Sequence, residues 1–365
     1  MSLPSVLVLG PSRKAISGVS THVNLLLESA LARQFELVHF QVGSEGRTES
    51  RAGTLARFVG SPFALAAAIL RHDAALVHVN CSLNAKSWWR DLVYMAVAKL
   101  CGARVVFQKH GGDLEAFAAG RLFRPIVRAA LRIADAIVVL SRRELEMFGR
   151  ALPGARIAVV PNGIDPAPFL RRPRAPAAQL GLLYIGRLAA GKGLGESIEA
   201  LALTRARGLE PRLVIAGTGP EEAQLRAHAA ALGVSDMVSF AGPAFGERKL
   251  ELLGNADVLL LPSYSEGLPY ALLEGMAAGL VPVVTPVGAV TDVVADGVHG
   301  RLVPVRDTRA IASAIEDLAR DAHALSRMSE ACRRRIAAAY SLERVARDTS
   351  AVYCMVIPRP ASQAG

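Results

Sequence analysis

Residues 257–279, DVLLLPSYSEGLPYALLEGMAAG, decide the fold of this chain. Asp257–Pro262 is an apolar run of strand length, and a segment containing Gly and Pro joins it to an apolar helix that reaches Gly279. A buried strand, a loop and a helix in this order form the repeating unit of a parallel α/β sheet. The stretch therefore predicts one such unit, with its loop at the carboxyl end of the strand.

The same stretch carries two glutamates, Glu266 in the loop and Glu274 on the predicted helix. They stand eight residues apart, which is a little over two helical turns. Both carboxylates can face one polyhydroxyl ligand, beside the amides of the helix N-terminus, when the first turn is irregular. We interpret the pair as a binding feature for ribose and sugar hydroxyls. The alternative is an ordinary solvated loop glutamate and a second glutamate on the helix surface.

On both sides of this stretch, short apolar strands alternate with segments of helix length, such as Thr21–Arg33 and Ser87–Leu100. This alternation predicts parallel sheets wound on both faces, which bind ligands beyond the carboxyl ends of their strands. The expected strands are Ser5–Leu9, Glu36–Phe40, Ala75–Val79, Arg104–Gln108, Ala136–Leu140, Arg156–Val160, Leu182–Ile185, Arg212–Ala216, Val238–Phe240, Val258–Leu261 and Val281–Val284.

A proline-rich segment divides this pattern into two halves. Four prolines lie between Pro166 and Pro176, both included, where they remove amide donors and disfavour helix. We therefore predict a first domain at 1–165, a linker at 166–178 and a second domain at 179–340. A last helix, capped by Ser341, is expected at 341–357, and a frayed tail at 358–365.

A glycine-rich loop follows the strand Leu182–Ile185. Its sequence, GRLAAGKG at 186–193, nearly matches the Walker A pattern, but Gly193 stands where that pattern has the Ser or Thr that holds magnesium. Glycines, the cations Arg187 and Lys192 and a following helix N-terminus suit a diphosphate bound without a metal. A plain turn with basic residues at the surface is the alternative.

Three other loops are candidates for ligand contacts. Gly217 and Gly219 follow the strand Arg212–Ala216, and by themselves they indicate only a tight turn into a helix. His110 follows the strand Arg104–Gln108 and precedes two glycines, where the backbone can approach a ligand closely. Gly18 opens a helix whose amides either bind phosphate or are merely capped.

The net charge of +10 is confined to the first half of the chain. Residues 1–175 hold 23 Lys and Arg against 12 Asp and Glu, whereas residues 176–365 hold 19 against 20. This asymmetry favours an anionic partner, such as a phospholipid surface or a lipid-phosphate acceptor, over a merely solvated basic surface. Nucleic acid is not expected, because no basic run interleaved with aromatic residues is present.

The cysteines and the hydropathy pattern bear on the compartment. Cys81, Cys101, Cys332 and Cys354 form no C-x-x-C pair and are expected to be buried free thiols in a reducing compartment. No apolar run approaches the ~18 residues that a membrane span requires. We therefore expect a cytoplasmic protein that can rest peripherally on the inner face of the membrane.

Taken together, these segments resemble glycosyltransferase family 4, of the bacterial group 1 type. The Glu266–Glu274 spacing is that family's E-x7-E signature, and Asn162 in PNGID (161–165) and Gly288 in TPVG (285–288) lie in similar segments. The resemblance covers nearly the whole chain. It implies the GT-B fold, in which two Rossmann-like domains face a central cleft and the last helix crosses back to the first domain.

The resemblance also implies a reaction and the residues that perform it. A hexose would pass with retention from a UDP- or GDP-sugar to a saccharide or lipid-linked saccharide in surface polysaccharide assembly, by front-face attack without metal or cofactor. The catalytic residues would be His110, which orients the sugar, Glu266, and the diphosphate-binding pair Arg187 and Lys192. The donor-binding residues would be Gly18, Asn162, Gly217, Gly219, Gly267, Leu268, Pro269 and the ribose-binding Glu274. Tyr270 and Gly275 depart from the usual family residues, and Tyr270 bears on which sugar the donor carries.

Other enzyme classes fit the sequence less well. An NTPase-like protein would need a hydroxyl residue at position 193, and a nicotinamide dehydrogenase would need G-x-G-x-x-G after the first strand. A metal-dependent transferase of the other major fold would be expected to contain D-x-D, and no two aspartates here are two apart. A nucleotide-sugar 2-epimerase of GT-B fold remains an alternative, although that class is not expected to carry the E-x7-E block.

Overall fold

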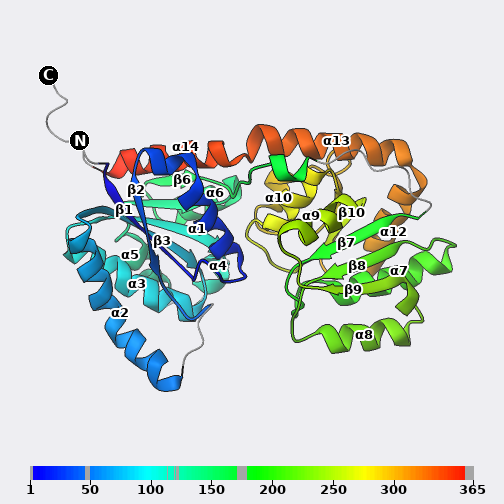
Figure 1. Ribbon diagram of the computed structural model, residues 1–365, viewed down its shortest axis with the longest axis horizontal. Helices are drawn as coiled ribbons and strands as arrows, with labels where there is room; N and C mark the ends of the chain where they lie inside the picture. Colours follow the sequence, from blue (N-terminus) through cyan, green and yellow to red (C-terminus); the bar gives the residue numbers. More distant parts are fainter. Residues whose placement is uncertain are drawn as a thin grey trace. The chain divides into compact units, whose positions relative to one another are not determined.

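The computed structural model describes residues 3–45, 50–112, 114–118, 120, 123–170 and 179–357 (Figure 1). The chain forms two compact units, which we call unit 1 (Met1–Gly163 with Leu342–Gly365) and unit 2 (Ile164–Ser341). Each unit contains a six-stranded parallel sheet, which confirms the predicted α/β class. Asp113, part of the predicted linker (171–178) and the tail (358–365) lie outside the described residues.

The sheet of unit 1 has the strand order β2-β1-β3-β4-β5-β6. The chain leaves β1 toward β2 and then resumes on the opposite side with β3, so a topological switch point lies between β1 and β3. The strands are β1 (Ser5–Gly10), β2 (Glu36–Gln41), β3 (Ala74–Ser82), β4 (Arg104–Gly111), β5 (Ala136–Val139) and β6 (Ile157–Val159). The helices are α1 (Gly18–Glu28), η1 (Ala30–Arg33), α2 (Arg51–Arg71), α3 (Ala85–Leu100), α4 (Leu114–Phe117), α5 (Phe123–Leu131), α6 (Arg142–Ala151) and α14 (Leu342–Val356).

Both faces of this sheet are buried, because successive side chains of a strand point to opposite sides. Val6 and Val8 of β1 belong to a cluster that includes residues of α1 and α14. Leu7 and Leu9 belong to the cluster on the other face, with Trp88 of α3. The last helix therefore completes the core of unit 1, as the predicted crossing back requires.

Unit 2 repeats the arrangement with the strand order β12-β11-β10-β7-β8-β9. Here the switch point lies between β7 and β10. The strands are β7 (Gly181–Ile185), β8 (Arg212–Ala216), β9 (Val238–Gly242), β10 (Val258–Leu261), β11 (Val281–Val284) and β12 (Arg301–Leu302). The helices are η2 (Ala167–Phe169), α7 (Leu194–Ala206), α8 (Glu222–Ala231), η3 (Ser235–Met237), α9 (Gly246–Gly254), α10 (Tyr270–Ala278), α11 (Val290–Val293), α12 (Thr308–Arg320) and α13 (Ala322–Ala339).

Two local predictions are wrong. The expected helix Thr21–Arg33 breaks at Ser29, whose extended backbone and hydroxyl, accepting from the amide of Leu31, start the separate helix η1. Serine competes with helix in this way because its side chain bonds to nearby backbone groups. The expectation of buried cysteines holds for Cys81 and Cys332 but not for Cys101, which is partly exposed, or Cys354, which is exposed.

Candidate functional site

Three predicted loops come together at the switch point of unit 2. The loop after β7 meets the loop after β10, where the Tyr264 amide donates to the Gly191 carbonyl at 2.8 Å. The turn after β8 joins them, because the Leu188 amide donates to the Thr218 carbonyl at 2.9 Å. Such a position, beyond the carboxyl ends of strands at a switch point, is where open α/β sheets bind ligands.

An ion pair links the charged residues of these loops. Lys192 Nζ lies 2.6 Å from Glu266 Oε1, and their side chains are 27% and 15% exposed. Arg187 lies in the same loop as Lys192 with an exposed side chain. The structure thus brings Lys192 and Glu266 together, and Arg187 lies five residues before Lys192 in the same loop.

The glycines of these loops allow backbone segments to touch. Gly193 has φ +71°, and a Cβ there would lie 2.2 Å from the Pro262 carbonyl oxygen. Gly217 has φ +156°, and a Cβ there would lie 1.8 Å from the carbonyl oxygen of Gly186. Gly219 packs as closely on the Leu188 carbonyl. These close contacts explain why glycine is required at the three positions. A direct contact of Gly217 and Gly219 with the donor stays a prediction.

Helix α7 begins directly after this loop. Its first residue is Leu194, and Gly193 occupies the N-cap position without a side chain to cap the helix. The first amides of a helix carry no intrahelical partners and a partial positive charge. With Lys192 next to it, this N-terminus forms a cationic end suited to an anion.

The second glutamate has a different cationic partner. Glu274 on α10 is 7% exposed, and its Oε1 lies 2.6 Å from Nζ of Lys249 on α9. Burial raises the pKa of Glu274, whereas the charge and hydrogen bond of Lys249 lower it. Sequence reasoning missed Lys249, because a single lysine on a helix carries no motif.

The segment between the glutamates is mostly enclosed. Leu268 is buried, Pro269 occupies the N-cap position of α10, and the Gly267 carbonyl accepts from the Ala289 amide at 2.8 Å. Tyr270, the residue that departs from the family pattern, is 8% exposed, and burial together with the nearby Glu274 carboxylate raises the pKa of its phenol. Its hydroxyl therefore stays protonated beside Glu274.

Unit 1 has a polar cluster at its own switch point. Asn80 of β3 donates from Nδ2 to the Leu9 carbonyl of β1 at 2.9 Å, and its Oδ1 lies 2.7 Å from His110 Nε2 on β4. The His110 ring centroid lies 4.5 Å from that of His22 on α1. Ser17 caps α1 by accepting from the Ser20 amide, which places Gly18 in the first turn.

The histidines of this cluster are neutral at physiological pH. Burial lowers the pKa of His22 to about 4, against hydrogen bonds with Gln108 and Asn162 that raise it. Burial also lowers the pKa of His78 to about 3, and Nδ1 of His78 lies 2.7 Å from the hydroxyl of Tyr353 on α14. The predicted residues His110 and Asn162 thus share a buried network with His22, Gln108 and His78. Sequence reasoning missed these three because their strands and helix are far apart in the chain.

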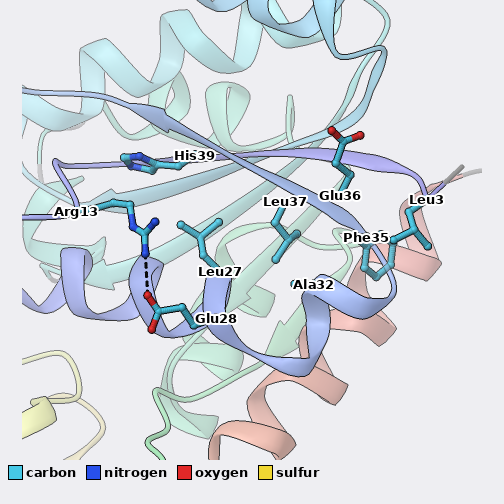
Figure 2. A pocket seen from close by; sticks show the side chains of 9 residues that line it. All are labelled: Leu3, Arg13, Leu27, Glu28, Ala32, Phe35, Glu36, Leu37 and His39. Atoms are coloured by element: carbon cyan, nitrogen blue, oxygen red, sulfur yellow. Dashed lines mark hydrogen bonds and ion pairs between the residues drawn. The ribbon is translucent and has the colours of Figure 1, made fainter.

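A hollow at the edge of unit 1 lies outside both groups of residues (Figure 2). Side chains of α1, η1 and β2 line it, and Arg13 pairs there with Glu28 at 2.7 Å. None of the predicted site residues lines this hollow. We therefore assign it no role in the site.

Both halves of the chain match glycosyltransferase family models. Residues 16–168 match the model described as Glycosyltransferase Family 4, and residues 171–335 match Glycosyl transferases group 1. The chain belongs to glycosyltransferase family 4. The order of the matches follows the two units of the structure.

Relatives of this family 4 chain are named for different glycosyl transfer reactions. It is 36% identical over 211 residues to glycogen synthase of Mycobacterium tuberculosis, a match covering 57% of this chain and 50% of the relative. It is 28% identical over 239 residues to the GDP-mannose:cellobiosyl-diphosphopolyprenol alpha-mannosyltransferase of Xanthomonas campestris, covering 63% and 62%. The chain spans about half the length of the first of these relatives.

Solved structures show that this family 4 chain has the GT-B fold. Sucrose-phosphate synthase from Thermosynechococcus elongatus superposes with a TM-score of 0.77 at 20% identity, over 96% of this chain and 98% of that one. Anabaena Alr3699/HepE in complex with UDP-glucose superposes with a TM-score of 0.76 at 17% identity, over 96% and 100%. Identities this low speak for the fold alone.

Proposed function

We propose that the protein is a retaining, metal-independent glycosyltransferase. It moves a hexose from a UDP- or GDP-sugar to a hydroxyl of a saccharide or lipid-linked saccharide, in the assembly of a surface or exopolysaccharide. The observation that carries this proposal is the Lys192–Glu266 pair at the switch point of unit 2, next to the N-terminus of α7. An anion-binding group and a sugar-binding carboxylate are there held side by side.

In this proposal, Arg187, Lys192 and the α7 amides bind the donor diphosphate. They stabilise the negative charge that develops on the leaving group, an effect that preorganised donors supply best in a partly desolvated site. Glu266 and the Gly267–Pro269 segment contact the sugar, and Glu274 binds the ribose. The donor phosphate itself assists deprotonation of the acceptor hydroxyl, so that no side chain acts as a nucleophile.

The names of similar proteins support both candidate donors. The Xanthomonas relative is named for GDP-mannose, and the Anabaena structure contains UDP-glucose. The same relative is named for a polyprenol-linked acceptor. A lipid-linked acceptor is therefore part of the proposal, and it places the reaction at a membrane surface.

The experiment is a thermal-shift panel with UDP, GDP and ADP on the wild type and on Lys192→Ala. A ligand at ~100 times its Kd adds about 2.7 kcal/mol of stability, which amounts to several degrees. One nucleotide should raise the Tm of the wild type but not of Lys192→Ala. Arg320→Ala, which removes an exposed cation of α12, is the control and should keep the shift. No shift of well-folded wild-type protein with any of the three nucleotides would overturn the proposal.

A second observation supports binding of the protein to the surface of an anionic membrane. Helix α2 is apolar on its outer face, formed by Ala56, Val59, Gly60, Phe63, Ala67 and Leu70, all of them exposed. Phe63 is 75% and Leu70 71% exposed, whereas Leu65 and Ile69 on the inner face are buried. The apolar face of a helix normally packs against another element, so the exposed outer face of α2 is open to an apolar partner.

The charge of unit 1 selects a lipid surface as that partner. By sequence, unit 1 holds 23 Lys and Arg against 13 Asp and Glu, whereas unit 2 holds 19 of each. Helix α2 itself contains three arginines and no acidic residue. An apolar face flanked by arginines matches helices that lie in the plane of anionic membranes. No helix among the described residues has the length and apolarity to cross a membrane.

Vesicle co-sedimentation tests this part of the proposal. The wild type should sediment with anionic vesicles more than with neutral ones, and Phe63→Asp with Leu70→Asp should abolish the difference. Phe245→Asp, at an exposed phenylalanine of unit 2, is the control and should sediment like the wild type. Equal sedimentation of wild type and α2 variant, or association with a second protein copy instead of lipid, would contradict the assignment.

A further inference from the structure

The Asn80 side chain connects three strands at the switch point of unit 1. It lies on β3, donates from Nδ2 to the Leu9 carbonyl of β1 at 2.9 Å, and places Oδ1 2.7 Å from His110 Nε2 on β4. Asn80 is 4% exposed. Water therefore has little access to either bond, and the amide is held by the protein.

These two bonds fix the proton on His110. The Leu9 carbonyl can only accept, so the NH₂ group of Asn80 must face it. The amide oxygen then faces His110, and because this oxygen also only accepts, Nε2 of His110 must carry a hydrogen. The connection to β1 thus decides which nitrogen of the imidazole is protonated.

The surroundings of His110 oppose a second proton on the ring. Burial is the main cause that lowers the pKa of His110 well below its usual value, and the neighbouring His22, His78 and Lys109 lower it further. Lys109 is itself paired with Glu144 on α6, and the two histidines are neutral at physiological pH. A neutral ring that is protonated at Nε2 has an unprotonated Nδ1, which can only accept a hydrogen bond.

We propose that Asn80 is a positioning residue that holds His110 in its Nε2–H tautomer, so that Nδ1 is the acceptor presented to a hydroxyl of the donor sugar. The role of the hydroxyl rests on the proposed function, whereas the tautomer does not. A hydrogen bond to one ring nitrogen of a histidine commonly fixes the tautomer and thereby decides whether the other nitrogen donates or accepts. Asn80 would therefore select hydroxyl donors over ligand groups that only accept.

Nitrogen-15 NMR of histidine-labelled protein tests the tautomer directly. Long-range nitrogen–proton correlations distinguish the two tautomers, and His110→Asn identifies the His110 signals among the eight histidines. The wild type should show His110 protonated at Nε2. Asn80→Leu, of similar volume but without polar atoms, should give a mixture of tautomers. A wild type protonated at Nδ1, or an unchanged tautomer in Asn80→Leu, would overturn the inference.

Kinetics separate a positioning role from a structural one. Asn80→Leu should lower kcat/KM about five- to tenfold, the scale of one neutral hydrogen bond. Asn80→Asp keeps an acceptor for Nε2–H and should recover the tautomer, but its carboxylate raises the pKa of His110. Its activity should therefore fall as the pH is lowered through the raised pKa and recover at higher pH, a limb that the wild type lacks. A flat pH profile in Asn80→Asp would contradict the positioning role.

The same experiments keep this inference separate from the proposed function. The expected tautomer in a wild type that transfers no sugar would support the positioning of His110 and overturn the proposed function. Normal transfer by His110→Asn would overturn the presentation of Nδ1 to the sugar. The three variants Asn80→Leu, Asn80→Asp and His110→Asn are each compared with the wild type by thermal unfolding, so that loss of fold is recognised by a lowered Tm.

Discussion

Lys249 neutralises the only glutamate of the E-x7-E pair that is nearly buried. Its ammonium group lies 2.6 Å from Glu274 and 6.0 Å from the ring centroid of Phe169 in η2. A carboxylate at 7% exposure needs such a partner, because burial without one raises its pKa and favours the neutral acid. Lys249 lowers the pKa of Glu274 against the effect of burial and so favours the charged form for the ribose role that we propose.

Lys249→Met should destabilise the protein by about 2–3 kcal/mol near neutral pH, because it leaves a nearly buried carboxylate unpaired. The pKa of Glu274 in the folded state rises further above its unfolded value, so the deficit relative to wild type is largest above that pKa. It should shrink as acid protonates Glu274. Urea unfolding at several pH values measures this, with Arg248→Met, an exposed neighbour, as a control expected within about 0.5 kcal/mol. A deficit that does not change with pH would contradict the assignment.

At the scale of single residues, the sequence predicted the charged groups better than their partners. The spacing of Glu266 and Glu274 and the loop cations were visible in the chain, and the structure brings Lys192 and Glu266 together. The pairing of Glu274 with Lys249, and of His110 with Asn80, depends on neighbouring strands and helices that only the folded sheet sets side by side. Local patterns carry no record of such contacts.

At the scale of elements, the bounds of the strands were predicted closely. The close backbone contacts of the loops that follow β7 and β8 explain why these loops contain several glycines. β10 runs over Val258–Leu261 as expected, and β4 extends three residues beyond the prediction to include His110. The extension was not predictable, because polar residues at the end of a buried strand look like a loop. The loop at Gly193 shows the same limit, since the sequence showed a departure from Walker A but not its cause.

Gly193→Ser restores the Walker A sequence and should nevertheless damage the protein. The residue has φ +71°, and its Cβ would meet the Pro262 carbonyl oxygen at 2.2 Å. We expect a loss of at least ~2 kcal/mol in unfolding free energy and no magnesium-dependent NTP hydrolysis. Gly195→Ser is the control, because a Cβ there meets nothing within 4 Å. NTPase activity in Gly193→Ser would show that the loop tolerates the Walker geometry.

At the scale of the whole molecule, unit 2 interrupts unit 1 in the sequence. The chain returns to unit 1 only with α14, which buries Val345, Val352 and Tyr353 in the core of its first 163 residues. The sequence predicted a last helix capped by Ser341, and the family resemblance supplied its destination. A fragment ending at Gly163 would leave the apolar cover of its sheet incomplete.

Tyr353→Ala should therefore destabilise unit 1 by about 3–5 kcal/mol, the usual cost of removing a large buried aromatic side chain. It also removes the hydroxyl that His78 contacts at 2.7 Å. Differential scanning calorimetry should show a lowered transition for unit 1, while that of unit 2 keeps its temperature. Met355→Ala, exposed on the same helix, is the control and should leave both transitions unchanged. A uniform shift of the whole unfolding curve would contradict independent units.

The Lys192–Glu266 ion pair gives the site an internal competitor for its own ligand. In the proposed reaction, a diphosphate competes with Glu266 for the three N–H donors of Lys192, so inorganic anions bind more weakly than the loop and helix alone would allow. This competition releases a carboxylate just where the sugar hydroxyls arrive. A nucleoside without phosphates cannot trigger this release, and Glu266 stays engaged. Donor recognition is therefore sequential: binding of the phosphates to Lys192 frees Glu266 to bind the sugar hydroxyls.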